Sequence, residues 1–206
     1  MPKQNTELTP AEAWKQLSEG NERFATNTQH HPNLDGRVRE ALRAGQNPIA
    51  VVLACSDSRV PVELIFDAGL GDVFVVRTAG EILGESVVGS VEFAVNGLGV
   101  PLVIVLGHES CGAIKASVDA LGGGVIPGDN QRTLIERVAP SILAARADGA
   151  TSTDDFERRH VAETLDQLLS KCPSIELKLA SGKIGMVGAR YQLSDGRVET
   201  LVSHGV

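Results

Sequence analysis

The stretch IAVVLACSDSR at residues 49–59 joins a short apolar run to a cysteine and then to polar residues at alternate positions. Three further runs are equally short, rich in β-branched residues and almost entirely apolar: DVFVVR at 72–77, PLVIVLG at 101–107 and IGMVGARYQ at 184–192. Strands that are apolar on both faces are typical of parallel sheets covered by helices. The four runs therefore predict the strands of a buried, mostly parallel sheet.

Helical patterns fill the segments between these runs. We expect helices over residues 61–67, 85–96 and 111–121, and then a long helical stretch over 133–170 that breaks near Gly149. Strands that alternate with helices in this order predict an α/β fold, with a central, mostly parallel β-sheet flanked by helices.

Residues 1–45 precede the first predicted strand and predict an N-terminal helical arm. Thr9 and Glu12 have the spacing of a capping box at the start of a helix. Apolar side chains then recur at helical spacing: Trp14, Leu17 and Phe24. This stripe packs either on the sheet of its own chain or on a partner subunit, and both alternatives stay open. The arm and the sheet together make one domain over residues 1–206, a usual length for a single domain.

The composition of the chain argues against several partners. The net charge is -7, from 19 basic and 26 acidic residues, which disfavours nucleic acid or an anionic membrane as the main partner. No run approaches the roughly 18 consecutive apolar residues of a membrane span. The N-terminus, MPKQNTELTP, lacks the apolar core of a signal peptide. The cysteines number 3, an odd count, so we expect a reducing, cytoplasmic location in which they are thiols or metal ligands.

Chemically reactive side chains follow two of the predicted strands. Cys55 directly follows the first run, His108 directly follows the run at 101–107, and Cys111 begins the next predicted helix. The carboxyl ends of parallel strands lie along one edge of a sheet, where α/β proteins bind their ligands. Residues three apart on a helical turn also point the same way. The sequence therefore predicts that these three side chains meet.

The chemistry of these three side chains favours a metal ion. A cysteine that binds metal is a thiolate, and the partial positive charge of a helix N-terminus favours that anion at Cys111. Two thiolates and one imidazole suit Zn²⁺, and three protein ligands leave one position for water, as in catalytic zinc sites. The alternative is that the cysteines are small buried hydrophobic residues and the histidine is a packed side chain. Their convergence in one fold favours zinc.

The sequences CSDSR at 55–59 and GHESCGA at 107–113 resemble the two signature motifs of the β-class carbonic anhydrases. The resemblance runs from about Trp14 to the last predicted strand, through AWKQLSEGNERF, GLGDVFVVRTAGE and GSVEFAVNGLGVPLVIVLGH. It implies reversible hydration of CO2 to bicarbonate and a proton. It also implies that the two cysteines and the histidine named above are the ligands of a Zn²⁺ cofactor.

The resemblance assigns Asp57 and Arg59 to a catalytic pair beside the metal. Asp57 is close enough in sequence to Cys55 to become a fourth ligand, which would close the site to water. Arg59 offers a planar fork that can hold the carboxylate away from the metal. Asp57 would then be free to accept a hydrogen bond from the reacting water, and the choice between these two states stays open. The alternative is a surface ion pair of little consequence.

The resemblance also implies residues that contact the substrate. Gln46 matches a position at which a glutamine contacts bicarbonate across a subunit interface. Three other residues match positions that line a small CO2 pocket: Phe74, Ala79 and Phe93. The family further implies a homodimer, or a dimer of dimers, in which the N-terminal helices wrap around the neighbouring subunit.

We expect CO2 hydration by this chain to favour alkaline pH. Zinc lowers the pKa of bound water to about 7 in a site built from three histidines. Two thiolates give the metal more negative charge than imidazoles do, so water bound there should be less acidic. Stopped-flow hydration rates measured from mildly acid to alkaline pH test this expectation, and a flat profile would contradict it.

Two other functions are compatible with the same motifs. A hydrolase of CS2 or COS would use the same zinc site, with its specificity set by access to the pocket. A zinc-stabilised binding protein without turnover would keep Asp57 as a permanent fourth ligand. The presence of Arg59 and Gln46 argues against this last alternative.

Several remaining features are expected to have no part in the site. The glycine-rich segment ALGGGVIPGDN at 120–130 reads as a surface loop. Cys172 has no histidine or cysteine at ligand spacing and is expected to be a spare thiol. Asp154 and Asp155 suit the start of a helix, and His160, within the charged run FERRHVAE, is expected to face solvent.

Overall fold

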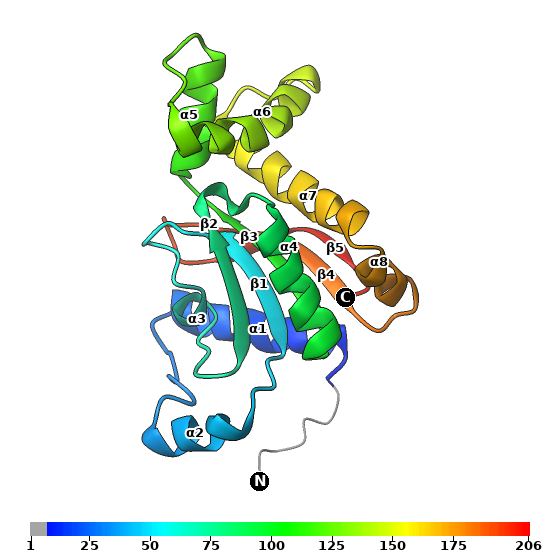
Figure 1. Cartoon of the computed structure of the whole chain (residues 1–206). Coiled ribbons are helices and arrows are strands. Elements are labelled where there is room, and N and C mark those ends of the chain that lie inside the picture. The colour runs from blue at the N-terminus through cyan, green and yellow to red at the C-terminus, as the bar shows by residue number, and fades with distance from the viewer. Residues whose placement is uncertain (1–7) are drawn as a thin grey trace.

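The computed structural model describes residues 8–206, so the first seven residues of the predicted arm over 1–45 lie outside the described part. In that part, a five-stranded sheet has the order β2-β1-β3-β4-β5 (Figure 1). Its strands are β1 (Ala50–Cys55), β2 (Val73–Thr78), β3 (Leu102–His108), β4 (Gly185–Tyr191) and β5 (Val198–His204). β1 pairs in parallel with β2 and β3, and β3 pairs in parallel with β4. The predicted mostly parallel sheet is confirmed.

The pattern of apolar runs does not predict β5, which is antiparallel to β4. β5 follows β4 through a tight turn in which the N–H of Gln192 donates to the carbonyl of Arg197 at 2.8 Å. Its sequence VETLVSH mixes polar and apolar residues. A search for runs that are buried on both faces therefore misses this strand at the edge of the sheet.

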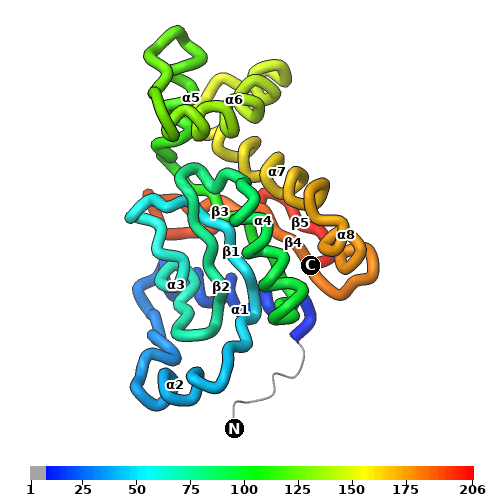
Figure 2. The backbone as a smooth tube through the Cα atoms, viewed as in Figure 1, coloured from blue at the N-terminus to red at the C-terminus, as the bar shows by residue number. Residues whose placement is uncertain are grey.

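Helices cover both faces of the sheet (Figures 1 and 2). On one face lie α1 (Pro10–Ala25) and α3 (Val62–Ile65), and on the other lie α4 (Glu85–Glu92), α7 (Thr153–Lys171) and α8 (Pro173–Ala180). Beyond the carboxyl end of the strands, α5 (Gly112–Leu121) and α6 (Arg132–Ala147) pack around an apolar cluster that includes Cys55 and Cys111. The short helix α2 (Gly36–Ala41) precedes β1. The predicted helices are confirmed, and α8 is an addition to them.

The burial of β1 explains why its sequence is apolar at every position. Val51 and Leu53 belong to the core cluster under α4 and α7, whereas Val52 and Ala54 belong to the cluster under α1 and α3. Each of these four side chains is fully buried. Successive residues of a strand face opposite sides of the sheet, so a strand covered on both sides needs apolar residues throughout.

The N-terminal helix α1 packs on the sheet of its own chain. Its capping box is formed, because the hydroxyl of Thr9 accepts from the N–H of Glu12 and the Glu12 carboxylate accepts from the N–H of Thr9. Leu17 is buried in the core, and the Trp14 ring meets Phe66 edge to face at 6.3 Å between centroids. The apolar stripe therefore packs on the sheet of its own chain, which is the first of the two alternatives given by the sequence. A partner contact for the arm over 1–45 stays a prediction.

The expectation of a glycine-rich surface loop is confirmed. Most of the segment 120–130 lies in the exposed connection between the end of α5 and the start of α6, as expected of a glycine-rich loop. In the part of the chain that the structure describes, no helix has the length and apolar character needed to cross a membrane.

Candidate metal centre and active site

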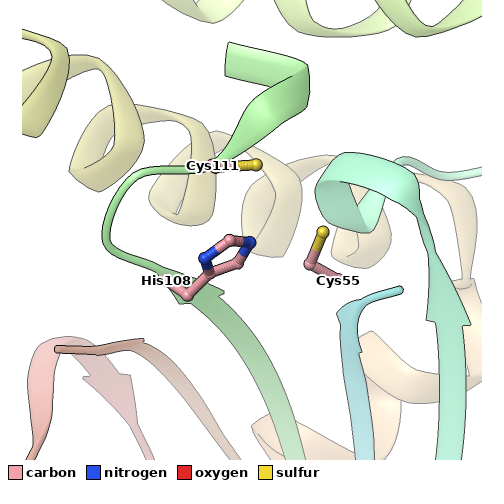
Figure 3. A group of neighbouring side chains, drawn as sticks. All are labelled: Cys55, His108 and Cys111. Atoms are coloured by element: carbon pink, nitrogen blue, oxygen red, sulfur yellow. The ribbon is translucent and has the colours of Figure 1, made fainter. Parts of the chain in front are cut away.

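Cys55, His108 and Cys111 meet at the carboxyl edge of the sheet, as the sequence predicts. Cys55 is the last residue of β1, His108 is the last residue of the neighbouring strand β3, and Cys111 caps the N-terminus of α5. Their Sγ and ring nitrogen atoms all lie within 4.8 Å of one another. Figure 3 shows the two sulfur atoms and the imidazole ring turned toward a common point. All three residues are buried.

Gly107 lets α7 lie directly against this end of β3. A Cβ atom at Gly107 would stand 2.4 Å from Cγ2 of Val161, which belongs to α7, and 3.1 Å from Oε1 of Glu81. The first distance is too short for any side chain, and the second is tighter than most Cβ contacts. The glycine before His108 therefore allows α7 to pack directly against the end of the strand that carries His108.

The ring of His108 is oriented as a metal ligand. Its Nδ1 lies 2.8 Å from the carbonyl oxygen of Glu109 and must donate its hydrogen there. Its Nε2 is buried and has no hydrogen-bond partner among the described residues. Nε2 therefore presents an unused lone pair, and a histidine held through its other nitrogen is typical of metal sites. Two thiols beside this lone pair fit a zinc ion.

Each of the two thiols changes the pKa of the other. The pKa of Cys55 falls to about 4, chiefly because of its hydrogen bond with the Cys111 thiol, with a further contribution from the N–H of Gly80. The same hydrogen bond, together with burial, raises the pKa of Cys111 above its usual value. One negative charge thus forms readily, and a bound cation would favour the second.

Asp57 lies at the rim of the cluster and is held by Arg59. One carboxylate oxygen accepts from the backbone N–H and the Nε of Arg59, both at 2.9 Å, and the other accepts from Nη2 at 2.7 Å. Arg59 also donates to the carbonyl of Ser110 at 3.2 Å. Asp57 Oδ2 is 3.9 Å from His108 Nε2. The hydrogen bonds from Arg59 hold the pKa of Asp57 well below its usual range, so this carboxylate is ionised near neutral pH.

Of the four residues expected to contact substrate, only Ala79 lies near this cluster within the chain. Ala79 directly follows Thr78, which is paired with Cys55 across the sheet. Phe74 is paired with Val51, four residues earlier on β1. At roughly 3.3 Å per residue, four residues correspond to about 13 Å along the strand.

Phe93 and Gln46 also lie away from the cluster. The rings of Phe93 and Phe74 are neighbours, with 6.1 Å between their centroids, and Phe93 is 54% exposed. Gln46 is an exposed residue that precedes the amino end of β1. One chain by itself therefore does not bring these three side chains to its own metal ligands.

The expectation that His160 faces solvent is wrong. His160 is 2% exposed, and its Nε2 donates to the carbonyl of Gly80 at 2.8 Å. Its charged neighbours Arg158 and Arg159 turn outward, where each forms ion pairs with acidic residues. The sequence FERRHVAE suggests a solvent-exposed helix because its charged residues outnumber its apolar ones. His160 nevertheless lies on the buried face of that helix.

Three further residues form hydrogen bonds with the site, and the sequence does not identify them as its supports. The guanidinium of Arg77 donates to the carbonyls of Cys55 and Asp57 at 2.7 to 3.0 Å. Gly80 donates its N–H to the Cys55 sulfur at 3.2 Å, and Glu157 accepts from the N–H of Cys111 at 3.1 Å. The position of Arg77 at the end of a strand that neighbours Cys55 is the one signal that could have suggested it.

Glu81 adds a buried carboxyl group near the cluster. Complete burial first, and then the charges of Cys55 and Glu157, raise the pKa of Glu81 well above its usual value. Burial therefore favours the protonated, neutral form of this carboxyl group.

Cys172, Asp154 and Asp155 are placed as expected. Cys172 is buried in the core under α7 and α8, outside the metal-ligating cluster. Burial raises the pKa of its thiol to about 11, so it stays protonated. The two aspartates lie in the first turn of α7, where the hydroxyl of Ser152 accepts from the N–H of Asp155.

The fold and the site define an α/β protein with a Cys-His-Cys cluster that could hold a metal ion, at the carboxyl edge of a mostly parallel sheet. The family model described as carbonic anhydrase matches residues 50–198. Carbonic anhydrase 2 of Mycobacterium tuberculosis is 50% identical over 188 residues, which cover 91% of each chain. A carbonic anhydrase of Mycolicibacterium smegmatis is 48% identical over 204 residues, covering 99% of this chain and 97% of that one. The chain belongs to the β-class carbonic anhydrase family.

Solved structures agree with this assignment. A β-carbonic anhydrase of Aspergillus fumigatus matches with a TM-score of 0.69 and 25% identity, over 91% of this chain and 89% of that chain. A tetrameric β-carbonic anhydrase of Sordaria macrospora has the same fold, with a TM-score of 0.72 and 24% identity over 90% and 95% of the two chains.

Proposed function

We propose that this chain catalyses the reversible hydration of CO2 to bicarbonate and a proton, with Zn²⁺ held by Cys55, His108 and Cys111. The observation that carries the proposal is the convergence of these three ligand atoms within 4.8 Å, in a chain of the carbonic anhydrase family. When bound, zinc supplies the Lewis acidity that makes water acidic enough to lose a proton near neutral pH.

The chain's own residues set up this chemistry. The carbonyl of Glu109 holds the ring of His108, so that Nε2 points to the two sulfurs. Arg59 holds Asp57 at the rim, where the ionised carboxylate can accept a hydrogen bond from the reacting water and so orient it toward CO2. Because the pKa of Asp57 is lowered by Arg59, its charge is constant from mildly acid to alkaline pH. If the hydration rate changes with pH in that range, the change must come from the ionisation of another group.

Ala79 is proposed to border the space that CO2 occupies. Its small side chain follows Thr78, the partner of Cys55 across the sheet, and so lies beside the metal ligands. A methyl group presents an apolar surface without filling the space next to the cluster. This suits a small apolar substrate.

The remaining substrate contacts are proposed to come from a second copy of the chain. Gln46, Phe74 and Phe93 lie toward the other end of β1 and β2, away from their own metal ligands. Phe93 is exposed, and β2 is the edge strand of the sheet, so both are available to a partner. A symmetric homodimer would place these three residues over the neighbour's cluster, and the arm over 1–45 is proposed to take part in that contact. Two dimers could associate further into a tetramer.

Mixing two inactive variants tests this arrangement. Arg59→Ala and Gln46→Ala chains, co-expressed with different tags, should recover about a quarter of the wild-type hydration rate, because half of randomly formed dimers are mixed and each has one intact site. A mixture of Arg59→Ala with Asp57→Asn is the matched control, since both changes lie on the metal side and no mixed dimer has an intact site. No recovery in the first mixture would show that Gln46 acts within its own chain.

A stopped-flow measurement tests the proposed reaction itself. Purified protein should hydrate CO2 at alkaline pH and contain about one zinc ion per chain, the stoichiometry of a three-ligand catalytic site. Zinc without CO2 hydration would refute the proposal. Parallel assays with CS2 and COS would show whether the same site takes those substrates instead.

The reducing cytoplasm is the proposed location. A Cys-His-Cys metal site needs both thiols free, and an oxidising compartment would join cysteines that lie this close together. The three cysteines are unpaired in the structure. Purification with and without reductant, with zinc measured in each, tests whether oxidation removes the metal.

A further inference from the structure

The helix α7 directs a pair of buried polar side chains, Glu157 and His160, at the metal-ligand residues. The two residues are one helical turn apart and are 3% and 2% exposed. Residues at this spacing lie on the same face of a helix. A helix that packs on a sheet normally buries apolar residues, so two adjacent buried polar side chains call for specific partners.

Glu157 holds the backbone at the second cysteine ligand. Its Oε1 accepts from the N–H of Cys111 at 3.1 Å, and this contact is buried. Its Oε2 accepts from Nε and Nη2 of Arg190 on β4, at 3.1 and 2.8 Å. Arg190 is 3% exposed, so the carboxylate is locked between β4 and the start of α5.

His160 holds the turn that donates to the first cysteine ligand. Its Nε2–H donates to the carbonyl of Gly80 at 2.8 Å, and its Nδ1 lies 3.0 Å from the hydroxyl of Ser141 on α6. Nε2 must carry the hydrogen, so in the neutral ring Nδ1 accepts from Ser141. The imidazole therefore connects α6, α7 and the turn after β2.

The backbone conformation of Gly80 directs an N–H of this turn at the sulfur of Cys55. Gly80 has φ 68°, a left-handed conformation, and its N–H points at the Cys55 sulfur from 3.2 Å. A Cβ atom here would stand 2.7 Å from Cβ of Ala113, so a side chain would push the turn away from α5. The carbonyl and the N–H of Gly80 belong to adjacent peptide planes, so the hydrogen bond from His160 to the carbonyl restricts how far the N–H can turn.

We infer that Glu157 and His160 are positioning residues that set the geometry of the two thiolates, each through a backbone group next to one cysteine. The inference rests on the proposed metal site. Neither side chain is a metal ligand. Removing a group that orients a metal ligand typically lowers metal affinity by about 10–100-fold. Replacing Glu157 or His160 should therefore weaken the retention of zinc.

Paired variants at His160 test the inference with zinc release to a strong chelator as the readout. His160→Leu removes the donor to Gly80 and should release zinc about 10–100 times faster than wild type. His160→Gln can place an amide N–H near the position of Nε2, so its rate of zinc release should be close to that of wild type. The matched control is Leu168→Ala, a fully buried position on the same helix outside the metal-ligating cluster, which lowers the melting temperature without touching the site.

The same variants loaded with Co²⁺ give a spectroscopic readout that a general loss of stability would not move. Loss of the Gly80 hydrogen bond leaves the Cys55 thiolate richer in electron density, so the sulfur-to-cobalt charge-transfer band of His160→Leu should shift to lower energy. Leu168→Ala should keep the wild-type band. Glu157→Gln, which weakens the ion pair with Arg190, should also release zinc faster than the control.

Three results would overturn the inference. Zinc release from His160→Leu at the rate of Leu168→Ala, or equal rates in the Leu and Gln variants, would reduce His160 to a packing residue. If Glu157→Gln released zinc at the wild-type rate, Glu157 would likewise be a packing residue only. If wild type itself binds neither zinc nor cobalt, the proposed function fails, and this outcome is distinct from the others because it is seen without any substitution.

Discussion

Replacing Arg59 with alanine is expected to abolish CO2 hydration while zinc stays bound. Arg59 supplies the hydrogen bonds that hold both carboxylate oxygens of Asp57. Without its side chain, Asp57 is free to turn from 3.9 Å away from His108 Nε2 into the position meant for water. We expect the rate to fall by about a hundredfold or more, the scale on which loss of one catalytic hydrogen-bond donor acts. Stopped-flow rates and zinc content, measured on the same sample, check this.

Two variants make the Arg59 result specific. Arg59→Lys keeps the positive charge but not the planar fork, so it should recover only part of the rate. Arg43→Ala removes an exposed arginine that pairs with Glu40, and it should leave both rate and zinc unchanged. Full turnover in Arg59→Ala would show that Asp57 needs no partner to stay off the metal.

Replacing Cys111 with serine is expected to remove both zinc and activity. The hydroxyl occupies nearly the same space as the thiol, so α5 should keep its start, but it does not ionise to an anionic ligand near neutral pH. One thiolate and one imidazole then remain of the three donors that meet within 4.8 Å. We expect a loss of zinc affinity larger than the roughly 10–100-fold that removal of an outer partner causes. Zinc content after dialysis and the hydration rate are the measurements.

Cys172→Ser is the matched control for the cysteine prediction. Cys172 is equally buried but lies in the core outside the metal-ligating cluster. A hydroxyl among apolar side chains should lower the free energy of unfolding by about 1–3 kcal/mol. Zinc and activity should be retained. If the two serine variants lost zinc equally, the effect of Cys111→Ser would reflect general destabilisation rather than a lost ligand.

Much of the metal centre is predictable from the sequence because strand ends place residues by topology alone. Cys55 and His108 end adjacent parallel strands, so they must emerge at one edge whatever the details of packing. Cys111 follows within one helical turn. The strand β5 is not predictable in this way, because an edge strand lacks the unbroken apolar run that burial on both faces demands.

The supporting residues escape sequence reasoning for a different reason. His160 lies among charged neighbours, and nothing in FERRHVAE indicates that one turn of the helix is covered by α6 and by the turn after β2. Phe74 and Phe93 likewise show that a motif match does not place a side chain at the site of its own chain. These placements depend on which surfaces of distant segments come into contact.

The sequence by itself determined the class of fold, the three residues that converge at the sheet edge and the family to which the chain belongs, since periodicity and motifs are local patterns. The tertiary structure decided that Asp57 is held by Arg59, that α7 supports both cysteine ligands and that three expected substrate contacts lie away from their own metal ligands. The physical reason is that hydrogen bonds and packing act over a few ångströms. Which groups come within that reach is decided by how the helices and the sheet pack together.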